Sequence, residues 1–151
     1  MEYKQLGNTG IRVSRLCFGG LTIGPLQANL PLKEGSAVII RALEQGVNFI
    51  DTAHIYITYP YIKEALKGEY KNTIIASKSY DYTYSGMQNS FYNCLNSIGR
   101  DYIDIFLLHE QESALTIKGH WEAVEFLISA REKGLVRAIG ISTHSVEGVR
   151  A

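Results

Sequence analysis

The sequence has little cysteine and proline and no excess of charge of either sign. Its 151 residues include two cysteines, Cys17 and Cys94, too few for a disulfide framework, so we expect a reducing, cytoplasmic setting. Fifteen Lys and Arg residues balance fifteen Asp and Glu residues. Because a nucleic acid or an anionic membrane would favour a basic surplus, we expect neither partner. No apolar run approaches the roughly 18–20 residues that span a bilayer, and the N-terminus lacks the apolar stretch of a secretory signal.

The chain instead shows a hairpin followed by a repeated unit of one helix and one short apolar strand. Residues 3–6 and 11–13 flank the turn-forming segment 7–10. A short buried strand is expected over residues 15–19, and a loop over 20–32. Hydrophobic periodicity then predicts helices over residues 33–45, 60–67, 87–98 and 118–133, each followed by a glycine, and strands over 47–50, 73–77, 102–108 and 136–141. This alternation indicates an α/β fold of parallel strands joined by helical crossovers, with no domain boundary.

Polar side chains stand where the predicted strands end. Asp51, Lys78 and His109 follow three consecutive strands, and Ser142 follows the next one. Taken singly, an aspartate at a strand end is most often a cap, a lysine is usually solvated and a histidine is usually structural. The carboxyl ends of parallel strands share one face of a β/α fold, however, and that face carries the active site. Together these residues predict a common site, which Tyr56, just beyond Asp51, would join.

These residue types suit the chemistry of a carbonyl group. Lys78 paired with Asp51 stays cationic, and a cation beside the Tyr56 phenol is expected to lower the phenol pKa from about 10. Tyr56 would then donate a proton to a carbonyl oxygen that His109 orients and polarises. Because such a site supplies no electrons, reduction would require a hydride from a nicotinamide cofactor.

At these residues the sequence resembles the aldo-keto reductase family. The resemblance rests on residues 16–20, 51–56, 76–78, 107–109 and 140–143, which occur in the family's order and at about its spacing. It implies an eight-stranded (β/α)8 TIM barrel, of which this chain would form about the first five strands after an N-terminal β-hairpin. We therefore expect residues 1–151 to be a single truncated domain, the N-terminal half of the barrel.

The resemblance also implies a role for individual residues. Tyr56 would be the general acid, Lys78 would tune it, Asp51 would pair with Lys78, and His109 would orient a small carbonyl substrate. NADPH would donate the hydride, and its nicotinamide end would lie along Gly19, Gly20, Leu21 and Ser142. The segment 21–27 further resembles a bacterial branch of the family that can carry an appended iron–sulfur module.

The sequence departs from the family's pattern at three points. Ile57 stands where a glycine usually follows the catalytic tyrosine, and the nearby Tyr59 competes with Tyr56 for the acid role, although the spacing favours Tyr56. Thr143 stands where an asparagine is common. The segments that normally hold the cofactor phosphates would lie beyond residue 151, so we expect the chain alone to bind NADPH weakly and to be inactive.

Two alternative functions remain open from the residues alone. The first is a metal-dependent barrel hydrolase with Asp51, His54 and His109 as ligands and Lys78 as a helper, although only four histidines occur and no His-x-His pair lies in the first strand. The second is a non-catalytic half-barrel. In either functional class, two unpaired sheet edges predict self-association.

Other aromatic and sulfur-containing residues are given structural interpretations. Tyr80, Tyr82 and Tyr84 alternate after Lys78 and are expected to form an aromatic surface loop. Cys17 and Cys94 are expected to be small buried hydrophobic residues.

Overall fold

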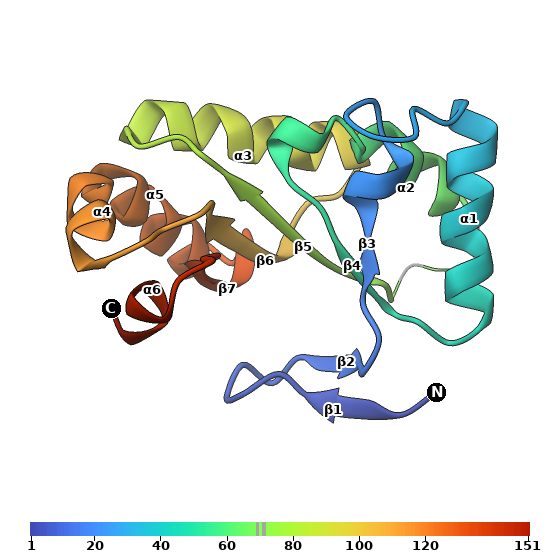
Figure 1. Cartoon of the computed structure of the whole chain (residues 1–151), viewed down its shortest axis with the longest axis horizontal. Coiled ribbons are helices and arrows are strands. Elements are labelled where there is room, and N and C mark those ends of the chain that lie inside the picture. Colours follow the sequence, from blue (N-terminus) through green and yellow to red (C-terminus); the bar gives the residue numbers. More distant parts are fainter. Residues whose placement is uncertain (69, 71) are drawn as a thin grey trace.

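The centre of the molecule is a five-stranded parallel sheet whose strands lie side by side in chain order (Figure 1). The computed structural model describes residues 1–68, 70 and 72–151. Every neighbouring pair of strands is parallel. The strands are β3 (Phe18–Gly19), β4 (Phe49–Asp51), β5 (Ile74–Ser79), β6 (Ile103–Leu108) and β7 (Val136–Ile141). This order confirms the predicted partial barrel, because consecutive parallel strands with helical crossovers are how a β/α barrel begins.

Helices cover one face of this sheet (Figure 1). The larger hydrophobic core lies between them and the sheet, with Phe91 of α3 against Phe106 of β6 at 5.1 Å between ring centroids. The α-helices are α1 (Leu32–Glu44), α2 (Tyr59–Ala65), α3 (Tyr84–Ile98), α4 (Ala114–Gly119), α5 (Trp121–Glu132) and α6 (Val146–Arg150), with two 3-10 turns, η1 (Gly20–Ile23) and η2 (His54–Tyr56). Gly99 ends α3 with φ 81°, the left-handed cap that its position predicted.

A hairpin packs against the opposite face of the sheet. Its strands β1 (Tyr3–Gln5) and β2 (Arg12–Ser14) are antiparallel, as predicted. Ile11 and Val13 form a second, smaller core with Ile74, Ala76 and Ile105. Because side chains alternate between the two faces of a strand, this core identifies which positions point away from the helices.

That alternation places the polar strand-end residues on the hairpin side of the sheet. Lys78 is two residues beyond Ala76 on β5, and His109 is four residues beyond Ile105 at the end of β6. Asp51 is two residues beyond Phe49, which packs on the same core. The three predicted site residues therefore share both an end and a face of the sheet.

The helix predicted over residues 118–133 is present as α5 (Trp121–Glu132), but its predicted start is wrong. Two helices occur there, and the chain breaks between them at His120, with φ −104° and ψ 23°. Ser113 begins the first one through a capping box with Thr116. Because that cap starts a helix upstream of Lys118, the periodicity read from the sequence joined the end of α4 to the whole of α5.

Smaller differences concern element ends. Only residues 18–19 of the predicted strand 15–19 pair with β4, and the predicted loop over 20–32 contains η1. The helix predicted from residue 87 begins earlier, at Tyr84, because the Thr83 side chain accepts a hydrogen bond from the Gly86 backbone N–H at 3.1 Å. In the described part of the chain, no helix combines the length and apolarity that crossing a membrane requires.

Candidate active site

Lys78 and Asp51 form an ion pair at the rim of the sheet. The Lys78 Nζ lies 2.6 Å from the Asp51 Oδ1 and also donates to the Thr52 carbonyl oxygen at 2.9 Å. The Lys78 side chain is only 7% exposed, whereas that of Asp51 is 38% exposed. A buried ammonium needs such partners, since desolvation is costly for an unpaired charge. Its third N–H has no acceptor among the described residues.

Tyr56 stands over this pair. The Lys78 Nζ lies 5.2 Å from the centre of the Tyr56 ring, and the ring of His109 meets Tyr56 edge to face at 5.8 Å and 75°. The segment that carries Tyr56 is closed by a buried hydrogen bond of 2.6 Å between the hydroxyls of Thr52 and Thr58. The structure thus brings together all four residues of the predicted tetrad from three consecutive strand ends.

The pKa of Tyr56 differs from what the sequence led us to expect. Burial raises it above its ordinary value, and the carboxylates of Asp51 and Glu110 raise it further. The Lys78 ammonium, whose charge favours the phenolate, is already engaged by Asp51 and the Thr52 carbonyl oxygen, and these influences outweigh it. Tyr56 is therefore a protonated phenol at neutral pH, a proton donor rather than a phenolate.

Tyr59, the competing candidate for the acid, lies elsewhere. It is 3% exposed, and its hydroxyl shares a hydrogen bond of 2.7 Å with the Ser77 hydroxyl between the helices and the sheet. Burial raises its pKa far above the ordinary tyrosine value. Tyr56, which is half-buried and faces His109, is the phenol available to a ligand.

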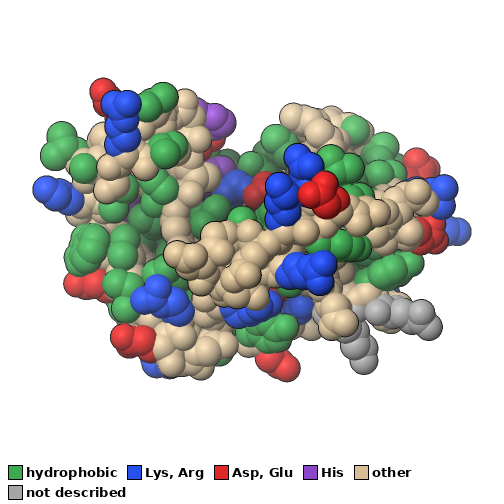
Figure 2. All heavy atoms as spheres, turned by 90° about the horizontal axis from the view of Figure 1, so that it is seen from below, with side chains coloured by type: hydrophobic (Ala, Val, Ile, Leu, Met, Phe, Trp, Pro, Cys, Tyr) green, Lys and Arg blue, Asp and Glu red, His purple; other side chains and the backbone are tan. Residues whose placement is uncertain are grey.

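His109 is held at the end of β6 by its backbone. Its N–H donates to the Ser79 carbonyl oxygen at 2.9 Å, which extends the parallel pairing of β5 and β6 by one step. Burial lowers the pKa of its imidazole below the ordinary value, and the Lys78 ammonium lowers it further. The ring is therefore neutral at pH 7, the state in which one ring nitrogen donates a hydrogen bond. Seen from the hairpin side, histidine, basic and acidic side chains meet in a hollow of the surface (Figure 2).

The predicted nicotinamide-end residues lie beside the tetrad, at the two edges of the sheet. Gly19 ends β3 with open space where a Cβ would stand, while a Cβ on Gly20 would lie 3.2 Å from the Asp51 carbonyl oxygen. Leu21 continues η1 and is half-buried. Ser142 follows β7, and its hydroxyl accepts the Glu110 N–H at 2.9 Å, which leaves its own proton free to donate.

Sequence reasoning missed Tyr80. The residue is 44% exposed in the loop after β5, as the predicted aromatic surface loop implies, but its ring also stacks on His109 with centroids 4.1 Å apart and planes 23° apart. The register contained the signal. Ser79 pairs with Leu108, so the next residues along the two parallel strands, Tyr80 and His109, are neighbours.

The metal-site alternative finds no support in the geometry. His54 is exposed, with its ring centre 6.3 Å from that of Tyr59. Across residues 1–68, 70 and 72–151, no three His, Cys, Asp or Glu side chains are grouped so as to hold a metal ion. The expectation that both cysteines are buried is half wrong, because Cys94 is buried but Cys17 is exposed at the start of β3.

A run of parallel β/α units with a Tyr, Lys, Asp and His cluster at the carboxyl ends of the strands defines a β/α-barrel enzyme site. The Aldo/keto reductase family model matches residues 15–151, nine-tenths of the sequence. The chain belongs to the aldo/keto reductase family, whose members are oxidoreductases of carbonyl compounds.

Individual relatives agree with this assignment. The aldo-keto reductase YhdN of Bacillus subtilis (strain 168) is 29% identical, with 97% of this chain and 48% of the relative aligned. The L-galactose dehydrogenase of Arabidopsis thaliana is 26% identical over 94% of this chain and 48% of that protein. A putative aldo-keto reductase structure from Pseudomonas aeruginosa superposes with a TM-score of 0.87 at 28% identity, covering 99% of this chain and 62% of that one. The chain thus spans about half the length of the curated relatives it matches.

Proposed function

We propose that this chain supplies the catalytic half of an NADPH-dependent reductase that converts aldehydes or ketones to alcohols. The observation that carries the proposal is the Lys78–Asp51 pair at 2.6 Å beneath a protonated Tyr56, with a neutral His109 against the same phenol. Each of these groups suits the reduction of a carbonyl, and none requires a metal.

Tyr56 and His109 would act on the oxygen of the substrate carbonyl. His109 donates a hydrogen bond that orients the oxygen and polarises the C=O bond. As the carbonyl carbon accepts a hydride, negative charge grows on the oxygen, and the Tyr56 hydroxyl transfers its proton there to complete the alcohol. The raised pKa of Tyr56 keeps that proton in place until the charge develops.

Lys78 and Asp51 would act on Tyr56 rather than on the substrate. Once the phenol has lost its proton, the Lys78 ammonium, 5.2 Å from the ring centre, stabilises the phenolate. Asp51 fixes the ammonium in that place at 2.6 Å. The pair therefore assists proton transfer in the transition state without ionising Tyr56 beforehand.

The residues at the sheet edges fit the nicotinamide end of a dinucleotide. The hydride comes from the reduced nicotinamide ring of NADPH when it is bound. Gly19 leaves open space beside Asp51, and the hydroxyl proton of Ser142 would be available to a carboxamide oxygen. Gly20, where a Cβ would lie 3.2 Å from the Asp51 carbonyl oxygen, and the half-buried Leu21 continue the chain from Gly19 into η1. For the cofactor phosphates, we propose contacts from the part of the barrel that the relatives have and this chain does not span.

The substrate class that we propose is a small carbonyl compound. One relative is named for L-galactose, a sugar, which makes sugar-derived carbonyls the first compounds to assay. Cys17 and Cys94 are both free, and we propose a reducing cytoplasm as the setting. The resemblance of residues 21–27 to a branch with an iron–sulfur module stays a prediction.

The decisive experiment compares Tyr56→Phe with Tyr59→Phe in a barrel-length protein that contains this chain. Loss of the general acid should lower carbonyl-dependent NADPH oxidation by about 100-fold to 10,000-fold. Tyr59→Phe is an equally conservative substitution that removes a hydroxyl at a buried position. It should leave turnover within a few fold of that of the unmodified protein and lower the free energy of unfolding by about 1 kcal/mol. Retained turnover in Tyr56→Phe would move the acid elsewhere.

A binding measurement on the 151-residue chain tests where the cofactor is held. We expect the chain to bind NADPH weakly. The fluorescence of the reduced nicotinamide, titrated against the chain, measures this binding. Tight binding would show that the phosphate contacts lie within these residues, contrary to the proposal.

A further inference from the structure

The ring of His109 is oriented by packing rather than by a hydrogen bond. Its Nδ1 is buried, and within the described residues it has no hydrogen-bond partner. A histidine that donates to a substrate normally has its other ring nitrogen tied to a neighbour, which fixes the tautomer and the plane. Here the two ring contacts are aromatic, with Tyr56 at its edge and Tyr80 on its face.

Tyr80 makes the closer of these two contacts. Its ring centre is 4.1 Å from that of His109 and the planes differ by 23°, an offset-stacked geometry. The centre of the Tyr56 ring lies 5.8 Å from that of His109, and the two ring planes meet edge to face at 75°. Tyr80 therefore restricts rotation of the imidazole, whereas Tyr56 leaves it free to tilt.

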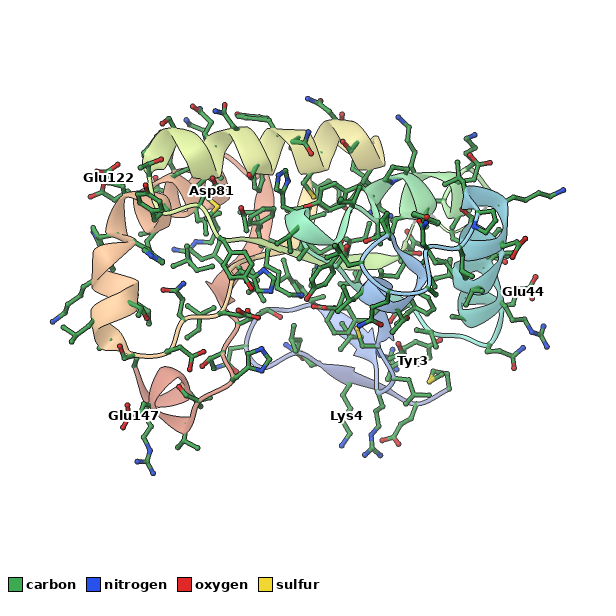
Figure 3. All side chains as sticks on the ribbon, turned by 45° about the horizontal axis from the view of Figure 1, so that its top comes forward. Tyr3, Lys4, Glu44, Asp81, Glu122 and Glu147 are labelled. Carbon is green, nitrogen blue, oxygen red and sulfur yellow. The ribbon has the colours of Figure 1, made fainter. Side chains whose placement is uncertain are left out.

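Tyr80 is near the Glu110 carboxylate as well as His109. Burial, together with the nearby Glu110 carboxylate, raises the pKa of Tyr80 to about 12. Glu110 has φ 52° and is held by its N–H to the Ser142 hydroxyl at 2.9 Å and by its carboxylate to His144 at 3.3 Å. In Figure 3 the next residue, Asp81, lies where the chain turns into α3, so Tyr80 is fixed between a strand end and a helix start.

We propose that Tyr80 is a positioning residue, whose ring sets the plane of the His109 imidazole and shields it from water so that the imidazole stays neutral. Four charged or titratable groups face His109 besides the two tyrosines. Lys78 and His144 oppose its protonation, while Glu110 and Asp51 favour it. Because these charges act in opposite directions, removal of water from the ring is the largest influence on its charge.

The test is the titration of the His109 ring protons by NMR, with the His109→Gln variant identifying the signal. In Tyr80→Ala the pKa of His109 should move up toward its ordinary value, because water reaches the exposed face. In Tyr80→Phe the stacked ring remains, and the titration should resemble that of the unmodified protein. Glu110→Gln should lower the pKa further, because it removes a charge that favours protonation.

Tyr82→Ala is the matched control. Tyr82 is 63% exposed and lies 6.0 Å from His120, so its loss should move the His120 signal, if any, and leave His109 unchanged. An unchanged His109 titration in Tyr80→Ala, or an equal upward shift in Tyr80→Phe, overturns the proposal. If the 151-residue chain self-associates, the same titration is made in the barrel-length protein.

The kinetic consequence rests on the proposed function and is measured separately. In the barrel-length protein, Tyr80→Ala should lower kcat about tenfold with a smaller change in KM, and Tyr80→Phe should restore it. A change confined to KM would make Tyr80 a substrate contact instead. The NMR titration does not depend on turnover. A protein that reduces no carbonyl but shows the expected shifts would therefore contradict the proposed function and still support the positioning role of Tyr80.

Discussion

The middle and the edges of the sheet differ in how many of their strand-end residues have partners within the chain. At the ends of β4, β5 and β6, Asp51 pairs with Lys78, and Tyr80 stacks on His109. The edge strands β3 and β7 each have one neighbouring strand. Gly19, at the end of β3, has open space where a Cβ would stand, and Ser142, just after β7, is half-buried. The comparison teaches that the tetrad needs only three consecutive β/α units, whereas strand pairing and cofactor binding need neighbours beyond both edges.

The largest expected effect concerns the open edges. We expect the 151-residue chain to self-associate at tens of micromolar, because β3 and β7 present unpaired backbone groups next to the apolar hairpin-side face. Analytical ultracentrifugation gives the mass directly. Ala138→Glu, which places a charge on that face of β7, should favour the monomer, and Leu115→Glu on the exposed surface of α4 should not. A stable monomer of the unmodified chain would contradict this prediction.

In the middle of the sheet, the largest loss of stability is expected from breaking the Lys78–Asp51 ion pair. Asp51→Asn leaves the buried Lys78 ammonium without its carboxylate and should lower the free energy of unfolding by on the order of 3 kcal/mol. Lys78→Met removes the charge itself and should cost distinctly less. Urea denaturation of both variants and of the double variant gives the coupling between the two side chains. Equal losses in the two single variants would mean that desolvation of Lys78 is not what Asp51 offsets.

The features that the sequence predicted are those that depend on local pattern. The glycine after each helix and the apolar runs between them predicted the order of elements, and alternation along β4, β5 and β6 was sufficient to bring Asp51, Lys78 and His109 to one face. These features follow from local periodicity and from the parallel fold. The roles of the site residues stay a prediction, which the arrangement supports.

What the sequence did not reveal depends on contacts between segments. Tyr80 is the exposed loop residue that the sequence predicted, but its stacking on His109 was not predicted, because it follows from the register of two strands and not from either segment alone. The separate helix α4 begins at the capping box of Ser113 and Thr116, and the chain breaks at His120 before α5. The pKa of Tyr56 was assigned the wrong direction, because burial and two carboxylates outweigh a cation already engaged by Asp51.

The charge of His109 offers a finer test of the middle of the sheet. Its pKa in the folded chain is lowered, so the unfolded chain takes up a proton first as the pH falls. The stability that the neutral ring contributes is complete above the unfolded pKa of about 6.5 and is lost as the pH falls through the lower folded value. Urea midpoints between pH 8 and pH 5 should show this loss, and His109→Gln should flatten the curve over that window. Glu110→Gln, which removes a charge that favours protonation of His109, should lower the His109 pKa further and extend the loss to more acidic pH.

The smallest expected effect lies in the segment that carries Tyr56. Ile57 has φ 57°, a left-handed conformation that costs a β-branched residue about 1–2 kcal/mol. Its side chain is 55% exposed, so little packing offsets that strain. Ile57→Gly removes the strain but adds freedom to the unfolded chain, and the net gain should be about 0.5–1 kcal/mol. Ile55→Gly, an equally exposed position of the same segment without a positive φ, should instead lower stability. If Ile57→Gly and Ile55→Gly destabilise the protein alike, contacts of the Ile57 side chain compensate the backbone strain. The position of Tyr56 then depends on the isoleucine itself.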